Sequence, residues 1–198
     1  MKPFITALLA SLFLAAPALA DDTLPKDEQV CTSQFALCTS APCIPDPSAP
    51  SKQALCTCEV THGPNFADKT KCELRGPQKV ATVSGLEVMQ VISTYAFVQA
   101  ATKPVMTCEN TTPWTDCLNA VCIVDPKHPL KAICTCPYAE TKDETYVTYG
   151  GSCNTNTCAS AVWSAATVGA FKEGSGALMR YMKLSEKPWA TCPGQPLN

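Results

Sequence analysis

Cysteine is the residue type in this chain whose number and spacing could support chemistry. The 198-residue sequence contains 14 cysteines, and four of them form the motif Cys-Thr-Cys at 56–58 and again at 134–136. Paired thiolates bind zinc or copper(I), and an exposed pair can exchange disulfides with a substrate. The motif therefore raises the hypothesis of a thiol–disulfide redox or metal-binding protein that uses these pairs.

The same cysteines have a structural interpretation, which we favour. Their number is even, and the sequence has no Cys-x-x-Cys of the kind whose thiol pKa is lowered at the start of a helix. An even set in an exported chain indicates a disulfide framework whose connectivity the sequence leaves open. We interpret all of them as disulfide-forming: Cys31, Cys38, Cys43, Cys56, Cys58, Cys72, Cys108, Cys117, Cys122, Cys134, Cys136, Cys153, Cys158 and Cys192.

Other catalytic arrangements have little support in the sequence. The chain has two histidines, His62 and His128, and no G-x-S-x-G motif. A Ser-His-Asp arrangement would need a nucleophile and an orienting acid around one of these histidines. Enzymatic activity is left open, a non-catalytic role is favoured, and no cofactor or metal ion is assigned.

Two proline-rich loops, 45–53 and 124–130, are each held at both ends by cysteines. Loops restrained in this way lose little conformational entropy on binding. They raise a further alternative function, protease inhibition, with Lys52 or Lys131 as the exposed anchor.

The N-terminus indicates export. A basic start, an apolar stretch and Ala18-Leu19-Ala20 predict a cleaved signal peptide over 1–20, followed by a polar tail over 21–30. Without Lys2, the chain carries 14 basic and 17 acidic side chains, which argues against nucleic-acid binding. No later run of eighteen apolar residues predicts a membrane span. We expect a secreted or periplasmic protein, where disulfides persist.

An internal duplication is the most informative pattern. Cys38-Thr-Ser-Ala-Pro-Cys43 matches Cys117-Leu-Asn-Ala-Val-Cys122 at an offset of 79, and the two Cys-Thr-Cys motifs match at 78. We predict two homologous units over 31–108 and 109–198. Cys31 and Cys158 have no counterpart in this alignment, which suggests a bridge between them.

Each unit is expected to contain a cysteine-stapled β-hairpin, over 44–58 and 121–136. Side chains alternate along a strand, so both cysteines of a Cys-Thr-Cys motif face one side and should bond different partners. The pattern of Ser84 and Glu87 predicts a capping box that begins a mostly buried helix ending before Pro104. Helices are also predicted over 159–168 and 177–182. The expected fold is a small disulfide-rich α+β protein of two tandem hairpin-plus-helix repeats.

The cysteine order also resembles a known family. Intervals of 6, 4, 12, 1 and 13 residues separate the six cysteines from Cys31 to Cys72, and 8, 4, 11, 1 and 16 separate those from Cys108 to Cys153. This order resembles that of EGF-like modules, and Gly150-Gly-Ser-Cys153 is similar to their closing turn. The resemblance covers about half of the mature chain. It implies the bridges Cys31–Cys43, Cys38–Cys56 and Cys58–Cys72, and no function is transferred from it.

Taken together, these patterns predict an exported, disulfide-stabilised, non-catalytic binding or structural protein. Its partner is expected to be an extracytoplasmic protein or a small apolar ligand held in a groove along the predicted helix of unit one. The redox or metal-binding role and the protease-inhibitor role remain the alternatives.

Overall fold

The computed structural model describes residues 29–68, 71–98, 103–109, 113–139, 145–195 and 197. The predicted signal peptide and residues 21–28 of the predicted tail lie outside the described residues. The described strands are β1 (Gln29–Leu37), β2 (Pro42–Pro45), β3 (Gln53–Asp68), β4 (Gln78–Val83), β5 (Leu86–Thr94), β6 (Val105–Cys108), β7 (Trp114–Asp116), β8 (Val121–Asp125), β9 (His128–Pro137), β10 (Tyr146–Tyr149) and β11 (Val162–Thr167). The helices are η1 (Cys72–Leu74), η2 (Thr155–Ala159) and α1 (Val168–Met182).

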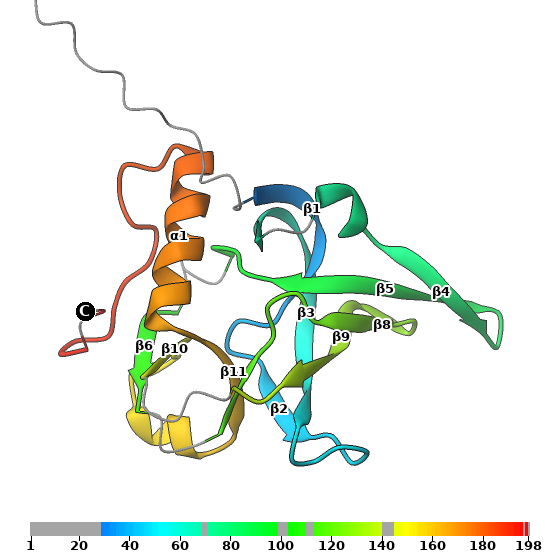
Figure 1. Cartoon of the computed structure of the whole chain (residues 1–198), viewed down its shortest axis with the longest axis horizontal. Coiled ribbons are helices and arrows are strands. Elements are labelled where there is room, and N and C mark those ends of the chain that lie inside the picture. Colours follow the sequence, from blue (N-terminus) through cyan, green and yellow to red (C-terminus); the bar gives the residue numbers. More distant parts are fainter. Residues whose placement is uncertain are drawn as a thin grey trace, which may run out of the picture.

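The predicted α+β fold of two hairpin-plus-helix repeats is wrong. Among the described residues, strands hold 51% and helices 15%, and the described strands belong to one connected sheet. β1, β5, β8, β9 and β3 form a closed barrel, because β1 pairs with both β5 and β3. β2, β11, β10 and β6 continue the sheet beyond β3. In Figure 1, α1 stands to the left of the barrel and the β4–β5 hairpin projects to the right.

The segment predicted as a helix from Ser84 onward forms the β4–β5 hairpin instead. Ser84 and Gly85 both have positive φ, 51° and 80°, as a two-residue type I′ turn requires. The strands on either side are rich in valine and isoleucine, whose β-branched side chains favour strands. Glu87 is not a capping residue: its carboxylate lies 2.6 Å from the Lys79 ammonium across the hairpin. Because this segment does not form a helix, the apolar groove predicted along that helix does not form either.

Of the two helices predicted in unit two, the second lies within α1, whereas 159–168 lies largely in β11. The helix begins after Thr167, whose hydroxyl accepts a hydrogen bond from the Ala170 N–H at 3.1 Å. On its inner side Leu178 packs with Phe66. A Cβ atom at Gly174 would lie 3.3 Å from the Phe66 ring, so glycine allows the close approach of helix and strand.

The strand pairings of the two predicted units recur at matched positions and cross between the units. β2 pairs with β3 through Cys43↔Cys56, and β8 pairs with β9 through Cys122↔Cys134. β5 pairs with β8, and β11 pairs with β2, so each unit contributes a strand beside the other. The duplication stays a prediction. The units are interlocked in one sheet, not separate modules.

Candidate functional site

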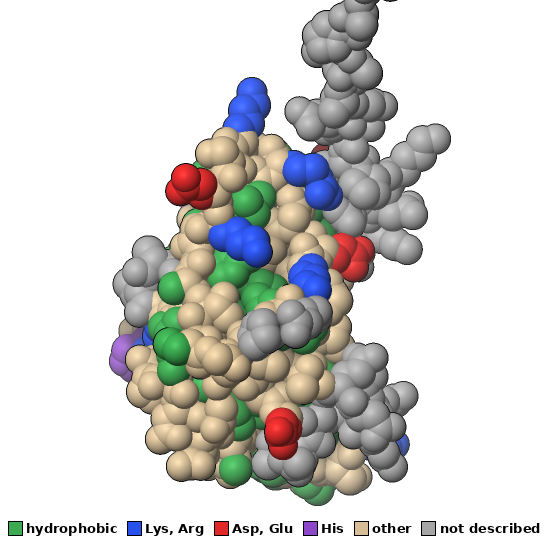
Figure 2. Space-filling model, turned by 90° about the vertical axis from the view of Figure 1, so that its left-hand side faces the viewer, with side chains coloured by type: hydrophobic (Ala, Val, Ile, Leu, Met, Phe, Trp, Pro, Cys, Tyr) green, Lys and Arg blue, Asp and Glu red, His purple; other side chains and the backbone are tan. Residues whose placement is uncertain are grey.

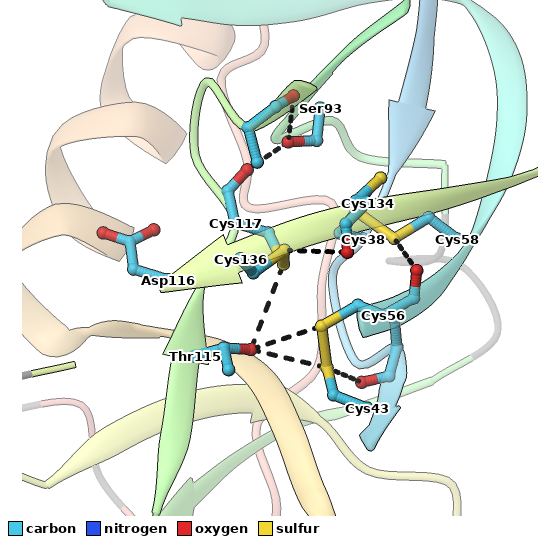
Figure 3. Close-up of a disulfide and its surroundings, with 12 residues drawn as sticks. Cys38, Cys43, Cys56, Cys58, Ser93, Thr115, Asp116, Cys117, Cys134 and Cys136 are labelled. Atoms are coloured by element: carbon cyan, nitrogen blue, oxygen red, sulfur yellow. Dashed lines mark hydrogen bonds between the residues drawn. A yellow bond between two sulfur atoms is a disulfide. The ribbon is translucent and has the colours of Figure 1, made fainter. Parts of the chain in front are cut away.

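The largest buried cluster is built around eight cysteines (Figure 3). They form the bridges Cys38–Cys58, Cys43–Cys56, Cys117–Cys136 and Cys122–Cys134. Each of the eight is at most 6% exposed. Small apolar residues of β1, β3 and β9, among them Ala36, Ala54 and Ala132, fill the space around the sulfur atoms. Covalent cross-links and close packing therefore occupy the same interior.

The Cys-Thr-Cys motifs explain how sulfur fills this interior. In β3 and β9 the cysteines point inward and are buried, while Thr57 and Thr135 between them are exposed. Cys56 bonds to Cys43 and Cys58 to Cys38, so the two cysteines of a motif bond different partners, as predicted. Within each unit the inner bridge joins two cysteines that are directly paired across the hairpin. The outer bridge joins the two cysteines that flank them in the sequence, so the inner bridge is nested inside the outer one.

The bridges implied by the EGF-like resemblance are wrong, and so is the suggested Cys31–Cys158 bridge. Cys31 bonds Cys72, and Cys158 bonds Cys108. β1 pairs with residues 59–68 of β3, and η1, which contains Cys72, lies against β1. The seventh bridge joins Cys153 to Cys192. Local cysteine order cannot show this, because the partners are brought together by strands far apart in the sequence.

Sulfur atoms of different bridges lie close together in the cluster. The Sγ atoms of Cys38 and Cys134 are 3.2 Å apart, and the Thr115 hydroxyl lies 3.4 Å from Cys43 Sγ and 3.5 Å from Cys56 Sγ (Figure 3). All fourteen cysteines are oxidised. Disulfide sulfurs are not thiolates, so metal binding or nucleophilic attack by the cluster would first require reduction of buried bonds.

The polar side chains beside the cluster form hydrogen bonds chiefly to backbone carbonyl groups. The Ser93 hydroxyl donates to the carbonyls of Cys117 and Ala120. Arg75, only 1% exposed, donates to the Asn119 side-chain oxygen at 2.6 Å and to the Ser93 carbonyl at 3.3 Å. Sequence reasoning missed Arg75, since a single arginine in a loop carries no pattern that indicates burial. It ties the loop after η1 to β5 and to the turn before β8.

Two tyrosines near α1 have hydroxyl groups whose pKa values are raised. Burial raises the pKa of Tyr149 to about 12. Burial, and next the nearby charge of Asp116, also raises the pKa of Tyr95, whose hydroxyl donates to the Ala165 carbonyl at 3.4 Å. Both hydroxyls stay protonated near neutral pH, so neither can act there as a general base.

The two histidines lie in exposed positions on different strands. His62 is in β3, and His128 begins β9 with its Nδ1 atom 2.7 Å from Asp125 Oδ2. Hydrogen bonds from His128 and then from the Lys127 N–H hold the pKa of Asp125 below its ordinary value. This group closes the β8–β9 turn, and the described residues around it show no nucleophile in contact with His128.

The two proline-rich loops held by cysteines, 45–53 and 124–130, differ in structure, and so do the positions of Lys52 and Lys131 beside them. The Lys52 loop is folded into successive turns, with Asp46 accepting hydrogen bonds from the Ser48 N–H at 2.8 Å and from Gln53 at 2.9 Å. Lys131 lies in the middle of β9, paired with Glu59 of β3. Neither lysine is carried on an extended, unpaired loop that a protease cleft could bind, so the geometry does not favour inhibition through them.

The outward side of the same strands is aliphatic. Because alternate residues face outward, the strand register sets them in two rows that run around the outside of the barrel from β5 to β3 and continue onto β2. One row contains Ile92, Val121, Thr135, Leu55 and Ile44, and the other contains Gln90, Ile123, Ile133, Thr57 and Pro42. Ile44 is 64% exposed, and Val121, Ile123 and Ile133 are 42–47% exposed. We call these two rows the aliphatic face.

A cavity of about 470 Å³ lies between β6 and η2. Thr107, Glu109, Thr145, Thr155 and Gln195 line much of it. Cys158 and Ala159 complete the lining, so the cavity is bounded by both polar and apolar groups.

Comparison with protein-family models, with curated protein sequences and with solved structures finds no match to this chain. Among the described residues, no helix is both long and apolar enough to cross a membrane. The seven disulfides are those expected of a protein in an oxidising, extracytoplasmic compartment.

Proposed function

We propose that this chain is an exported, secreted or periplasmic, non-catalytic binding protein. Four nested disulfides hold its strands, and the same strands display the aliphatic face to a partner. The observation that carries the proposal is the alternation in β3 and β9, where every inward cysteine is bonded and outward neighbours such as Leu55 and Ile133 are uncharged.

A surface held in this way is suited to binding. Contiguous exposed apolar side chains on a folded protein mark interaction sites more often than accidents of composition. A rigid scaffold reduces the conformational entropy lost when the partner binds. The redox alternative has weaker support, since the Cys-Thr-Cys cysteines that it would use are 0–1% exposed.

The test is thiol labelling of the native protein. The oxidised protein, treated with iodoacetamide and measured by intact mass, should carry no label. A reduced and unfolded sample provides the control and should take up fourteen labels, one for each cysteine. One rapidly labelled cysteine in a Cys-Thr-Cys motif would contradict the proposal and favour thiol–disulfide exchange. Sequencing of the exported protein should place its first residue at Asp21 if the predicted signal peptide is removed.

A further inference from the structure

The chain that follows α1 covers one edge of the sheet. We call residues 187–195 the C-terminal strap. In Figure 1 the strap runs beside α1 towards β6, which is the last strand at one end of the described sheet. It lies on the side of the molecule that faces the viewer in Figure 2. Its aromatic side chain, Trp189, is half-buried against the rings of Phe97 and Phe171.

The strap is hydrogen-bonded to the outer edge of β6. The Val105 N–H donates to the Ala190 carbonyl at 2.7 Å, and the Cys192 N–H donates to the Val105 carbonyl at 2.9 Å. The Thr107 N–H donates to the side-chain oxygen of Gln195 at 3.0 Å. The strap therefore occupies backbone groups of β6 that would otherwise form an open sheet edge.

The Cys153–Cys192 bridge ties the strap to the loop after β10. Cys153 is half-buried, and the residues on both sides of it, 151–152 and 154–156, are exposed. Its φ of 55° lies in the left-handed region, which is unfavourable for a residue with a Cβ atom. Its partner Cys192 lines a surface cavity of about 400 Å³. A small thiol can therefore reach this bridge from solvent, and accessible bridges are the ones most readily reduced.

We propose that the Cys153–Cys192 bridge is a site of thiol–disulfide exchange with a dithiol, and that its opening releases the strap from β6. A thiolate of the reductant attacks the Sγ atom of Cys153. The S–S bond breaks, and its electron pair leaves on the sulfur of Cys192, which takes up a proton from water. The second thiol of the reductant then displaces Cys153 from the mixed disulfide, so the reductant is oxidised to a disulfide and the bridge is reduced to two thiols. This reactive site goes beyond the proposed function, because the aliphatic face does not use it.

Cys31–Cys72 is the other bridge with a half-buried cysteine, Cys72, and its surroundings are held more firmly. Cys31 lies within β1, which is paired with β3, and Cys72 lies in η1, shortly before the buried Arg75. Arg75 is hydrogen-bonded to neighbouring backbone carbonyls, so the two thiols would stay close after reduction and re-form their bond. The strap belongs to no helix or strand. Cys192 can therefore move away from Cys153, which lowers the effective concentration of one thiol at the other and favours the reduced form.

Limited reduction tests which bridge opens first. The oxidised protein is incubated with graded concentrations of dithiothreitol, quenched with iodoacetamide and mapped by peptide mass spectrometry. We expect labels on Cys153 and Cys192 at dithiothreitol concentrations roughly tenfold below those that label any other cysteine. First labelling at another bridge, or labelling of all bridges at once, would overturn the inference. The proposed function is judged separately, because its labelling test uses no reductant.

Removal of the bridge tests the release of the strap. In the double variant Cys153→Ser/Cys192→Ser, the Val105 amide should exchange hydrogen roughly tenfold faster than in the wild-type protein. The matched control is Cys31→Ser/Cys72→Ser, because the two bridges have sequence separations of 41 and 39 and restrain the unfolded chain almost equally. The control should leave the Val105 amide at its wild-type rate, and protected amides in β3 and β9 show that each variant is folded. Equal acceleration in both variants, or an unchanged Val105 amide in the first, would contradict the release of the strap.

Discussion

Removal of one nested bridge should lower the free energy of unfolding by less than its loop length suggests, because the other bridge still holds the hairpin. Cys43–Cys56 spans 13 residues and Cys38–Cys58 spans 20. In the chain-entropy model, loops of this size restrict the unfolded chain by about 3.0 and about 3.3 kcal/mol when each bridge acts alone.

The bridges do not act alone. With Cys38–Cys58 intact, Cys43 and Cys56 are joined by two paths in the unfolded chain. One path passes through the Cys38–Cys58 bridge and is about eight residues long, and the other is the direct chain segment of 13 residues. Together the two parallel paths behave as a single loop of about five residues. Deletion of the inner bridge should then lower the free energy of unfolding by about 2 kcal/mol, and deletion of the outer one by about 2.5 kcal/mol. Deletion of both should cost about 5.5 kcal/mol, which is about 1 kcal/mol more than the sum of the single deletions.

Urea unfolding of paired cysteine-to-alanine variants, without reductant, measures these differences. The nested pair Cys122–Cys134 and Cys117–Cys136, with separations of 12 and 19 residues, provides the matched control and should give the same pattern. Strictly additive losses in both hairpins would refute the reasoning that the bridges restrain one shared loop.

Three further predictions concern single positions. Arg75→Met should lower the free energy of unfolding by about 3 kcal/mol, because it leaves buried acceptors unpaired; unchanged urea stability would contradict the anchoring role. Gly85→Ala should speed amide hydrogen exchange in β4, since alanine is strained at a φ of 80°, whereas Ser84→Asn should slow it, and equal rates would argue against the type I′ turn. His128→Ala should raise the Asp125 pKa toward 3.8 in an NMR titration. Because the folded-state pKa is lowered, the contribution of Asp125 to stability is present above the unfolded-state pKa and is lost as pH falls through the folded value.

The sequence predicted the local features that depend on alternation. The inward direction of the Cys-Thr-Cys cysteines followed from the two-residue repeat of a strand, and the β2–β3 and β8–β9 hairpins followed from turn residues between apolar segments. The sulfur-rich interior of the hairpins could therefore be predicted in part from the Cys-Thr-Cys motifs.

The rest depends on partners distant in the sequence. Ser84 followed by Glu87 fits both a capping box and a hairpin turn with its first paired residues, and the positive φ of Ser84 separates the two only in the structure. β5 is completed by β8 of the other unit, so no pattern within unit one shows its place. The aliphatic face was missed for the same reason, since Ile44 and Val121 join one row only through β3 and β9.

Disulfide mapping of the non-reduced protein by fragmentation mass spectrometry tests the central claim most directly. We expect Cys43 linked to Cys56 and Cys38 linked to Cys58, with Cys122–Cys134 and Cys117–Cys136 repeating the pattern. A Cys38–Cys56 link, or a free thiol at any of these eight positions, would contradict an interior built from four nested bridges.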